Sequence, residues 1–221
     1  MFERLIKIIG KDKLDRINNS QILLIGVGGV GGYIFNSLVR NGFKNITIID
    51  FDKYELSNLN RQLYSSIDNI GLYKVNVLKD IALSIRKDIN ITAINVKLES
   101  KMFDELNLSN YTYIIDACDD SKLKIDLLRY AKDNNINIIS SMGTGNRLFP
   151  SKLEIMKLKD TFNDPLAKKI RTNIGKKYLN IPVLCSTEVP IKTNGVGTCS
   201  DVPMCAASLI SSYVLRKIIE D

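Results

Sequence analysis

The sequence contains no histidine among its 221 residues. This absence excludes the Ser–His and Cys–His pairs that activate a nucleophile, and it excludes every metal site that relies on imidazole ligands. Any chemistry must therefore come from carboxylates, lysine, arginine, amides and backbone groups.

Cysteines are few, and none of the four lies in a Cys-x-x-Cys pair; they are Cys118, Cys185, Cys199 and Cys205. We therefore expect no zinc site. A disulfide framework is also disfavoured, because the chain is large and shows no secretion signal. Cys118 and Cys185 are interpreted as packing residues. The alternative for Cys185 is a thiol that accepts an acyl group.

Long hydrophobic runs, Pro- or Ser-rich linkers and internal repeats are missing as well. No uninterrupted apolar stretch approaches the roughly 20 residues that span a bilayer. Charged residues Glu3 and Arg4 follow Met1 almost at once, unlike a signal peptide. The sequence thus predicts a cytoplasmic protein without membrane association, made of a single domain over residues 1–221.

Charge is abundant but uneven, with a net value of +7. Residues 1–140 carry 19 basic and 17 acidic side chains, whereas residues 141–221 carry 12 and 7. The segment 147–177 alone holds nine basic residues against three acidic ones. A clustered positive field attracts phosphate backbones, which favours a polyanionic partner. The alternative is a solvated, lysine-rich surface.

Short apolar runs alternate with helical patterns along the first two thirds of the chain. We expect strands at residues 22–25, 46–51, 91–96, 113–117, 136–140 and 181–186, and helices at 29–40, 72–86, 121–133 and 206–219. Ser121 is a plausible N-cap of its helix, and Asp164 with Pro165 opens a further basic helix. Residues 153–158 fit an antiparallel extension strand. The pattern indicates an α/β fold with a Rossmann-like, doubly wound, mostly parallel sheet.

The first predicted strand runs into a glycine-rich turn. Gly26, Gly28 and Gly31 satisfy the pattern G-x-G-x-x-G, and Asp50 lies 19 residues beyond Gly31 at the end of the second strand. Such a turn brings backbone N–H groups close to phosphate, and the acid can accept hydrogen bonds from ribose. These features predict nucleotide binding but do not separate NAD from ATP.

Polar residues after the second strand separate the two nucleotides. Asp52, Asn58 and Arg61 follow Asp50, and Lys74 lies on the next predicted helix. A dehydrogenase has no need for these groups, whereas fixed Arg, Lys and Asn donors stabilise the charge that develops on departing pyrophosphate. The alternatives are a surface lysine and an arginine in a local salt bridge.

An acidic turn follows the strand predicted at residues 113–117. Ligands bind beyond the carboxyl ends of parallel strands, so an acid there would face the nucleotide phosphates. We expect Asp119 to hold Mg²⁺, which prefers carboxylate and phosphate oxygens. The alternative for Asp119 is a helix cap, a role for which Asp120 is better suited.

These separated motifs, taken in order, resemble the ATP-binding core of the ubiquitin-activating enzymes and of the thiamine- and molybdopterin-pathway (ThiF-type) adenylyltransferases. The resemblance covers about residues 20–145. It implies that ATP is bound by Gly26, Gly28, Gly29, Gly31, Asp50, Asp52, Asn58, Arg61, Lys74 and Asp119. Arg61, Lys74 and Asp119 would act in catalysis, with Asp119 linked to Mg²⁺. Arg4 would reach the partner's ATP site in a homodimer.

Later segments are similar to one branch of that superfamily. Residues 161–171 and 185–190, and the crossover loop at 143–145 followed by Pro150, resemble tRNA threonylcarbamoyladenosine dehydratases. The resemblance implies ATP-dependent dehydration of the modified nucleoside in tRNA through an acyl-adenylate. Lys168, Lys169 and Arg171 would contact the tRNA backbone. It also admits a monovalent cation near ATP and a sulfur-transfer protein as a partner.

Three other functions remain open. The first is activation of the carboxyl-terminal glycine of a ubiquitin-like or sulfur-carrier protein, against which the missing zinc pairs count. The second, a nicotinamide-dependent oxidoreductase, leaves Arg61, Lys74 and Asp119 without a role. The third is a regulatory nucleotide-binding module, which would not need so full a set of site residues.

Overall fold

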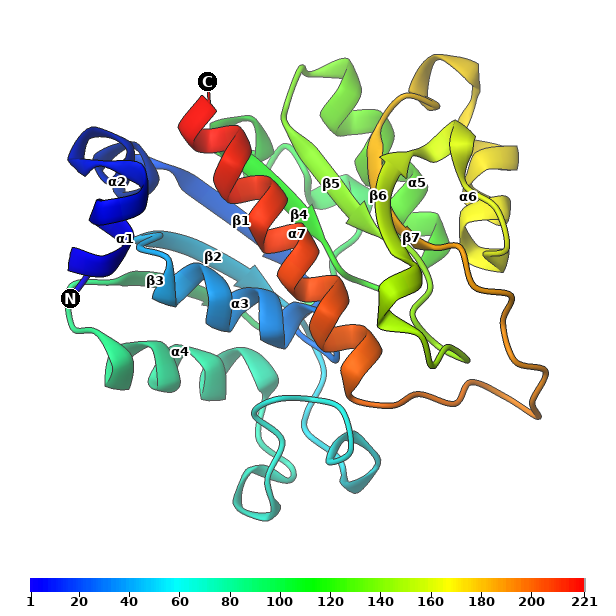
Figure 1. The fold of residues 1–221 in the computed structure, drawn as a ribbon, viewed down its shortest axis with the longest axis horizontal. Helices are drawn as coiled ribbons and strands as arrows, with labels where there is room; N and C mark the ends of the chain where they lie inside the picture. The colour runs from blue at the N-terminus through cyan, green and yellow to red at the C-terminus, as the bar shows by residue number, and fades with distance from the viewer. Residues whose placement is uncertain (221) are drawn as a thin grey trace.

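A seven-stranded sheet with helices on both faces forms the core of the computed structural model, which describes residues 1–220 (Figure 1). The strands are β1 (Gln21–Ile25), β2 (Asn45–Ile49), β3 (Asn90–Ile94), β4 (Tyr113–Asp116), β5 (Ile138–Ser141), β6 (Leu153–Lys157) and β7 (Pro182–Ser186). Their order in the sheet is β3-β2-β1-β4-β5-β7-β6. Neighbouring strands are parallel, except that β6 is antiparallel to β7. The predicted doubly wound sheet with an antiparallel extension is confirmed.

The helices pack as two layers because the central strands are apolar on both faces. In β1, Leu24 lies in one buried cluster and Leu23 in the other. The helices are α1 (Glu3–Ile9), α2 (Lys11–Asn19), α3 (Gly31–Arg40), α4 (Lys74–Ile85), α5 (Ser121–Asp133), α6 (Pro165–Ile174) and α7 (Asp201–Glu220). Helices α2, α3, α4 and α7 contribute to the first cluster, and α5 and α6 to the second. The sequence analysis did not predict α1 and α2.

Helix α7 corrects the expectation that no segment is long and apolar enough to cross a membrane. Its 20 residues meet that test by length and composition. In the fold, however, α7 crosses one face of the sheet beside α3 (Figure 1). Ala206, Ile210, Val214 and Ile218 form a buried stripe along it. Packing in the core therefore accounts for its apolar composition.

The N-terminal caps of α5 and α6 can be compared with the caps predicted from the sequence. Asp164 caps α6 as predicted, accepting a hydrogen bond from the Ala167 backbone N–H at 2.9 Å. The prediction for Ser121 was wrong: Asp120 caps α5 by accepting from the backbone N–H groups of Lys122 and Leu123, and Ser121 is the first helical residue. The carboxylate accepts two donors where a hydroxyl one position later would lie inside the first turn.

A fully buried ion pair joins α5 to the ends of β4 and β5. Lys124 Nζ lies 2.9 Å from Asp116 Oδ2, and it also donates to Ser140 Oγ at 3.2 Å and to the Ser141 carbonyl at 2.8 Å. Burial, the largest single effect, opposes the charged form of Lys124, but the nearby negative groups, led by Asp116, together outweigh it and raise the pKa of the amine. The charged amine is held by three hydrogen bonds.

The glycine turn between β1 and α3 packs directly on the end of β4. A Cβ at Gly26, whose φ is +81°, would lie 2.8 Å from the Ala117 carbonyl carbon. A Cβ at Gly31 would lie only 1.9 Å from the Gly26 carbonyl oxygen, whereas one at Gly32 would meet its nearest neighbour, Val27 O, at 3.5 Å. Close backbone contacts therefore exclude a side chain at Gly26 and at Gly31. At Gly32 a methyl group would make only an ordinary van der Waals contact.

Replacing Lys124 with Met should lower the free energy of unfolding by about 3–5 kcal/mol, because Asp116 would be left as a buried, unpaired charge. Urea denaturation measures this change. Lys132→Met on the exposed face of the same helix is the control and should change stability by less than about 0.5 kcal/mol. Equal effects of the two substitutions would contradict the structural role of the pair.

Gly31→Ala should destabilise the protein by about 2 kcal/mol or more, since the new methyl group overlaps backbone that cannot move freely. Gly32→Ala, one residue later in the same helix, should be neutral or stabilising because alanine favours the helix. Thermal unfolding of both variants tests the contrast. A similar loss of stability in both variants would contradict the prediction, because it would show that neither position tolerates a side chain.

Candidate functional site

A cleft of about 650 Å³ lies beyond the carboxyl ends of the parallel strands. It opens where the sheet order reverses between β1 and β4, the point at which doubly wound sheets bind ligands. Its walls come from the segments that follow β1, β2, β3, β4 and β5. The lining includes the predicted residues Gly26, Gly28, Gly29, Asp50, Asp52, Asn58, Arg61, Lys74 and Asp119. The fold therefore brings together residues spread over 94 positions, from 26 to 119.

The half-buried acid Asp50 links the end of β2 to the glycine turn. Its Oδ2 accepts from the Val27 backbone N–H at 2.8 Å and its Oδ1 from the Asp52 N–H at 2.8 Å. Burial raises the pKa of Asp50, while these hydrogen bonds and the nearby Lys74 act against that rise. Each carboxylate oxygen keeps a second lone pair for a further donor such as a ribose hydroxyl.

Two cationic side chains, Lys74 and Arg61, also line the cleft. Lys74 is the first residue of α4, almost fully buried, and its Nζ pairs with Asp52 Oδ2 at 2.9 Å. A buried cation at the positive end of a helix is unfavourable alone, so nearby negative charge is needed to hold it there. Arg61 folds over Gly29 and donates to the Ser57 carbonyl at 2.5 Å and to Asn60 Oδ1 at 3.1 Å.

Two buried amides lie between these cations and the glycine turn. Asn58 Oδ1 accepts from the Glu55 N–H at 3.2 Å, which closes the short helix Leu56–Asn58 that precedes Arg61. Gln62, which the sequence analysis did not single out, is only 7% exposed and lines the cleft. Its Oε1 has no hydrogen-bond partner within residues 1–220. Gln62 therefore places a buried, unsatisfied acceptor in the wall of the cleft.

Asp119 lies exposed in the loop from β4 to α5 and faces the same cleft. Among the described residues no group of three or more acids or cysteines could enclose a metal ion. Mg²⁺ does not need such a group, because it is bound through one or two carboxylates together with substrate phosphates and water. A single accessible carboxylate beside the glycine turn fits that requirement.

One wall of the cleft is apolar, which the sequence analysis missed. It comprises Phe51, Val96, Leu98 and Leu123. These residues follow β2 and β3 or belong to α5, so they meet only in the folded chain. An apolar wall beside the carboxylate of Asp50 suits the base of a nucleotide.

The rim opposite that wall is formed by two loops that hydrogen-bond to each other. Residues 143–145 and Val196 line the cleft, and Asn146 Oδ1 accepts from the Gly197 backbone N–H. Asn60 Nδ2 donates to the Thr198 carbonyl at 2.9 Å, which links this rim to the segment that carries Arg61. The later loop therefore borders the site although it lies more than 130 residues from Asn60 in sequence.

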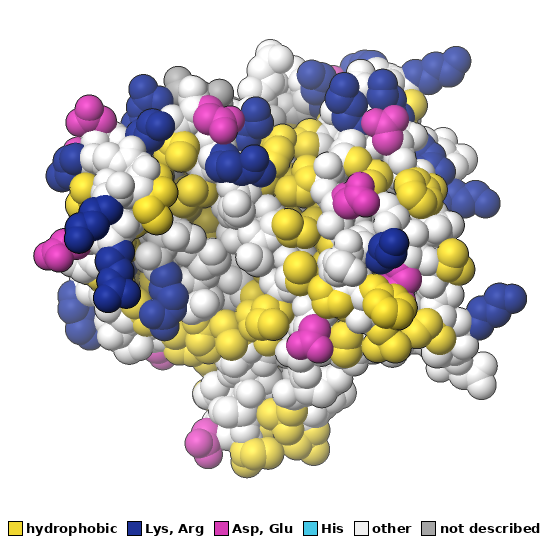
Figure 2. Space-filling view, viewed as in Figure 1, with side chains coloured by type: hydrophobic (Ala, Val, Ile, Leu, Met, Phe, Trp, Pro, Cys, Tyr) yellow, Lys and Arg dark blue, Asp and Glu magenta, His cyan; other side chains and the backbone are white. Residues whose placement is uncertain are grey.

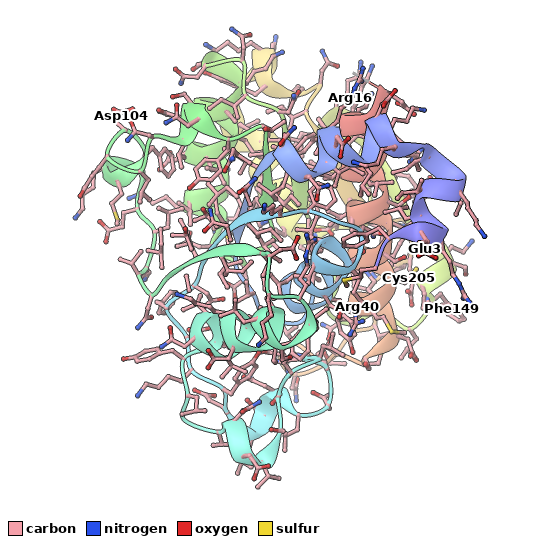
Figure 3. All side chains as sticks on the ribbon, turned by 90° about the vertical axis from the view of Figure 1, so that its left-hand side faces the viewer. Glu3, Arg16, Arg40, Asp104, Phe149 and Cys205 are labelled. Carbon is pink, nitrogen blue, oxygen red and sulfur yellow. The ribbon has the colours of Figure 1, made fainter. Side chains whose placement is uncertain are left out.

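Other predicted residues lie outside the cleft lining. Gly31 packs within the turn, as described above. Lys168 and Lys169 are exposed on α6, where Figure 2 shows basic side chains along the right-hand edge of the molecule. Arg171 is half-buried and donates to the Thr161 carbonyl at 2.5 Å, so part of its hydrogen-bonding capacity is used within the protein. Arg4 is exposed on α1, next to the labelled Glu3 at the edge of the molecule (Figure 3).

Arg147 does not belong to the surface charge with which the sequence analysis counted it. It is 3% exposed, and its guanidinium donates to the carbonyls of Glu188 and Asn163. Burial also decides the behaviour of the thiols. The pKa of Cys185 is raised to about 12 by desolvation and by the neighbouring Asp164. Burial raises the pKa of Cys118 as well. Neither thiol is prepared to act as a nucleophile near neutral pH.

Similarity to known proteins extends over the whole fold. The chain is 35% identical over 189 residues to tRNA threonylcarbamoyladenosine dehydratase 2 of Saccharomyces cerevisiae, covering 84% of this chain and 42% of the yeast protein. It is 32% identical over 192 residues to tRNA threonylcarbamoyladenosine dehydratase of Bacillus subtilis, covering 86% of this chain and 76% of that protein.

The three-dimensional structure is also similar to that of a known dehydratase. The crystal structure of Escherichia coli tRNA N6-threonylcarbamoyladenosine dehydratase in complex with ATP superimposes with a TM-score of 0.94 at 27% identity. The match covers 99% of this chain and 93% of that one. The ThiF family model matches residues 2–162, which include every residue of the cleft up to the first rim loop. The resemblance read from the sequence is confirmed, and the chain belongs to the ThiF family.

Proposed function

We propose that this protein is an ATP-dependent tRNA threonylcarbamoyladenosine dehydratase formed by a single adenylyltransferase domain. One observation carries the proposal: a single cleft combines a glycine turn, a half-buried acid, two cations and an accessible carboxylate. That set suits cleavage of the α–β phosphate bond of ATP rather than hydride transfer. Its agreement in sequence and fold with dehydratases supports the choice of substrate.

The cleft residues account for ATP binding and for the first step. The base lies against the apolar wall, Asp50 accepts from the ribose, and the N–H groups of the glycine turn bind phosphate. The threonyl carboxylate of the modified nucleoside attacks the α-phosphorus, and the α–β bond breaks. The products are an acyl-adenylate and pyrophosphate. Lys74 and Arg61 stabilise the charge that develops on the departing pyrophosphate.

The second step needs no enzyme nucleophile. A nucleophilic atom within the same modification attacks the activated acyl carbon, the ring closes, and AMP leaves with the carboxylate oxygen. The net change in the nucleoside is loss of one water. The absence of histidine and the protonated state of Cys185 are compatible with this chemistry, because the substrate supplies its own nucleophile.

The Lys74–Asp52 pair keeps the cation in place before ATP arrives. Asp52 is half-exposed while Lys74 is buried, so incoming phosphates can replace the carboxylate as the partner of the amine. Asp119 would hold Mg²⁺, which supplies further neutralisation of phosphate charge. Each acid lies three residues beyond the end of a strand, Asp52 after β2 and Asp119 after β4.

Further partners belong to the same proposal. Arg4 would enter the ATP site of the second copy in a homodimer, and Lys168, Lys169 and Arg171 would contact the tRNA backbone. A monovalent cation near ATP and a sulfur-transfer protein complete the set expected of such an enzyme, which we place in the cytoplasm and not at a membrane. The exposure of Lys168 and Lys169 supports their role, whereas Arg171 has fewer donors to spare.

The decisive test is incubation of the purified protein with ATP, Mg²⁺ and tRNA that bears threonylcarbamoyladenosine. Mass spectrometry of the nucleosides should show loss of one water that depends on ATP. Asp119→Ala should reduce the rate by about 100-fold or more, since it removes electrostatic stabilisation of the reacting phosphates. Glu105→Ala, which changes an exposed acid outside the cleft lining, should react as the wild type does.

An unchanged nucleoside mass with competent tRNA would reject the dehydratase proposal. Release of pyrophosphate on addition of a small protein with a free carboxyl-terminal glycine would then identify the protein as a carrier-activating adenylyltransferase.

Cys185→Ser should leave the dehydration rate within about twofold of the wild type, because the buried, protonated thiol does not act as a nucleophile. Single-turnover kinetics with modified tRNA measure this. A loss of activity together with an acyl group on Cys185 in the wild type would contradict the proposed route.

A further inference from the structure

Large apolar side chains are exposed on the loops that border the basic segment. Leu148, Phe149 and Phe162 are 58%, 60% and 52% exposed, and Val189 is 70% exposed. Figure 3 shows Phe149 at the molecular surface. Single exposed apolar residues are common, but several on loops that bond to one another indicate a binding surface.

A buried arginine holds these loops in place. The Arg147 guanidinium donates to the Asn163 carbonyl at 2.7 Å and to the Glu188 carbonyl. The Glu188 carboxylate in turn accepts from the backbone N–H groups of Leu148 and Phe149 at 3.1 Å each. The loops that carry Phe149, Phe162 and Val189 therefore form one cross-linked unit. Because hydrogen bonds already hold the backbone beneath the exposed rings, little conformational entropy is lost when a partner binds them.

The segments next to this unit carry positive charge. Lys152 is exposed, and its carbonyl accepts from the Thr187 backbone N–H at 2.8 Å. Lys168 and Lys169 are exposed in the first half of α6, the helix that Asp164 caps. The other exposed bases of residues 147–177 lie toward the opposite ends of β6 and α6; they are Lys157, Lys159, Lys176 and Lys177. Figure 2 shows dark-blue side chains on the right-hand side of the molecule, with yellow side chains gathered below them. Positive charge around exposed aromatic rings is the combination that binds unpaired nucleic acid, in which bases stack and phosphates meet lysines.

The same unit continues into the cleft. Residues 143–145 line the cleft, and Phe149 follows four residues later. The Gly143 N–H donates to Asp164 Oδ2 at 2.9 Å, and Asp164 also caps α6, whose Leu166 lines the cleft. A nucleoside that enters the cleft would therefore have its neighbouring nucleotides beside the exposed rings.

We propose that Phe149 and Phe162 stack on unpaired bases next to the nucleotide that enters the cleft, while the surrounding lysines contact the RNA backbone. This inference rests on the proposed function and adds to it: the rings recognise a single-stranded loop, which duplex RNA cannot offer. Arg147 and Glu188 act as positioning residues for the rings.

Variants of Phe149 and Phe162 test the proposal by equilibrium binding to the modified tRNA. Each single alanine should weaken binding about fivefold or more, as expected when a base loses its aromatic neighbour. Phe149→Trp should bind as the wild type does, and Phe149→Leu should be as weak as the alanine variant because it lacks a π face. The control is Ile8→Ala on α1, which removes an even more exposed apolar side chain (82%) that is not part of the cleft lining.

Two further readouts separate stacking from other effects. The alanine variants should bind a fully paired RNA of the same length as well as the wild type does, and their KM for ATP should not change. Sedimentation should show the same molecular mass for the variants and the wild type.

Wild-type affinity of the Phe149→Ala/Phe162→Ala protein, or full affinity of Phe149→Leu, would overturn the stacking role. A lower mass of the alanine variants would also overturn it and would make this surface an interface between copies of the chain. If the wild type itself fails to dehydrate the modified tRNA, the proposed function fails first. Catalysis by the wild type with unaltered binding by the variants would reject the stacking role alone.

Discussion

The buried pair between Lys124 and Asp116 fixes the edge of the sheet on which the cleft depends. It joins α5 to the ends of β4 and β5 through contacts at 2.9 Å and 2.8 Å. The loop with Asp119 begins directly after Asp116, and the rim loop begins directly after β5. The glycine turn packs in turn on Ala117, with no room for a side chain at Gly26. If the ion pair were broken, the glycine turn, the loop with Asp119 and the rim loop after β5 would no longer be held in place by the same contact.

Charge within the cleft alternates in sign before any ligand is bound. Asp50 and Asp52 lie beside Lys74, and the acid Asp119 lies across the glycine turn. Asp50, Asp52 and Lys74 are held by backbone contacts or by one another, so little reorganisation of these groups is needed when phosphate charge arrives. Such preorganisation is the main source of transition-state stabilisation in reactions of this type. It also explains why a site without histidine or a reactive thiol can be sufficient.

The region after β5 links this chemistry to the surface. Asp164 caps α6, binds the rim at Gly143 and raises the pKa of Cys185. Arg147 ties together the loops that expose Phe149 and Phe162. The rigid rim and the exposed rings are therefore parts of one hydrogen-bonded unit. In the proposed enzyme, one segment would both border the cleft and contact the RNA.

The local pattern of the sequence determined the strands, the glycine turn, the cap at Asp164 and the set of polar residues that meets in the cleft, because each depends on near neighbours or on spacing along one element. It did not reveal which charges are buried. Lys124 and Arg147 read as ordinary surface cations, and their partners lie 8 and 41 residues away. The apolar wall, the rim contact between Asn60 and Thr198, and the layer position of α7 likewise arise from distant segments. Only the tertiary structure decides these features, since burial and long-range hydrogen bonding depend on which elements the sheet order brings together.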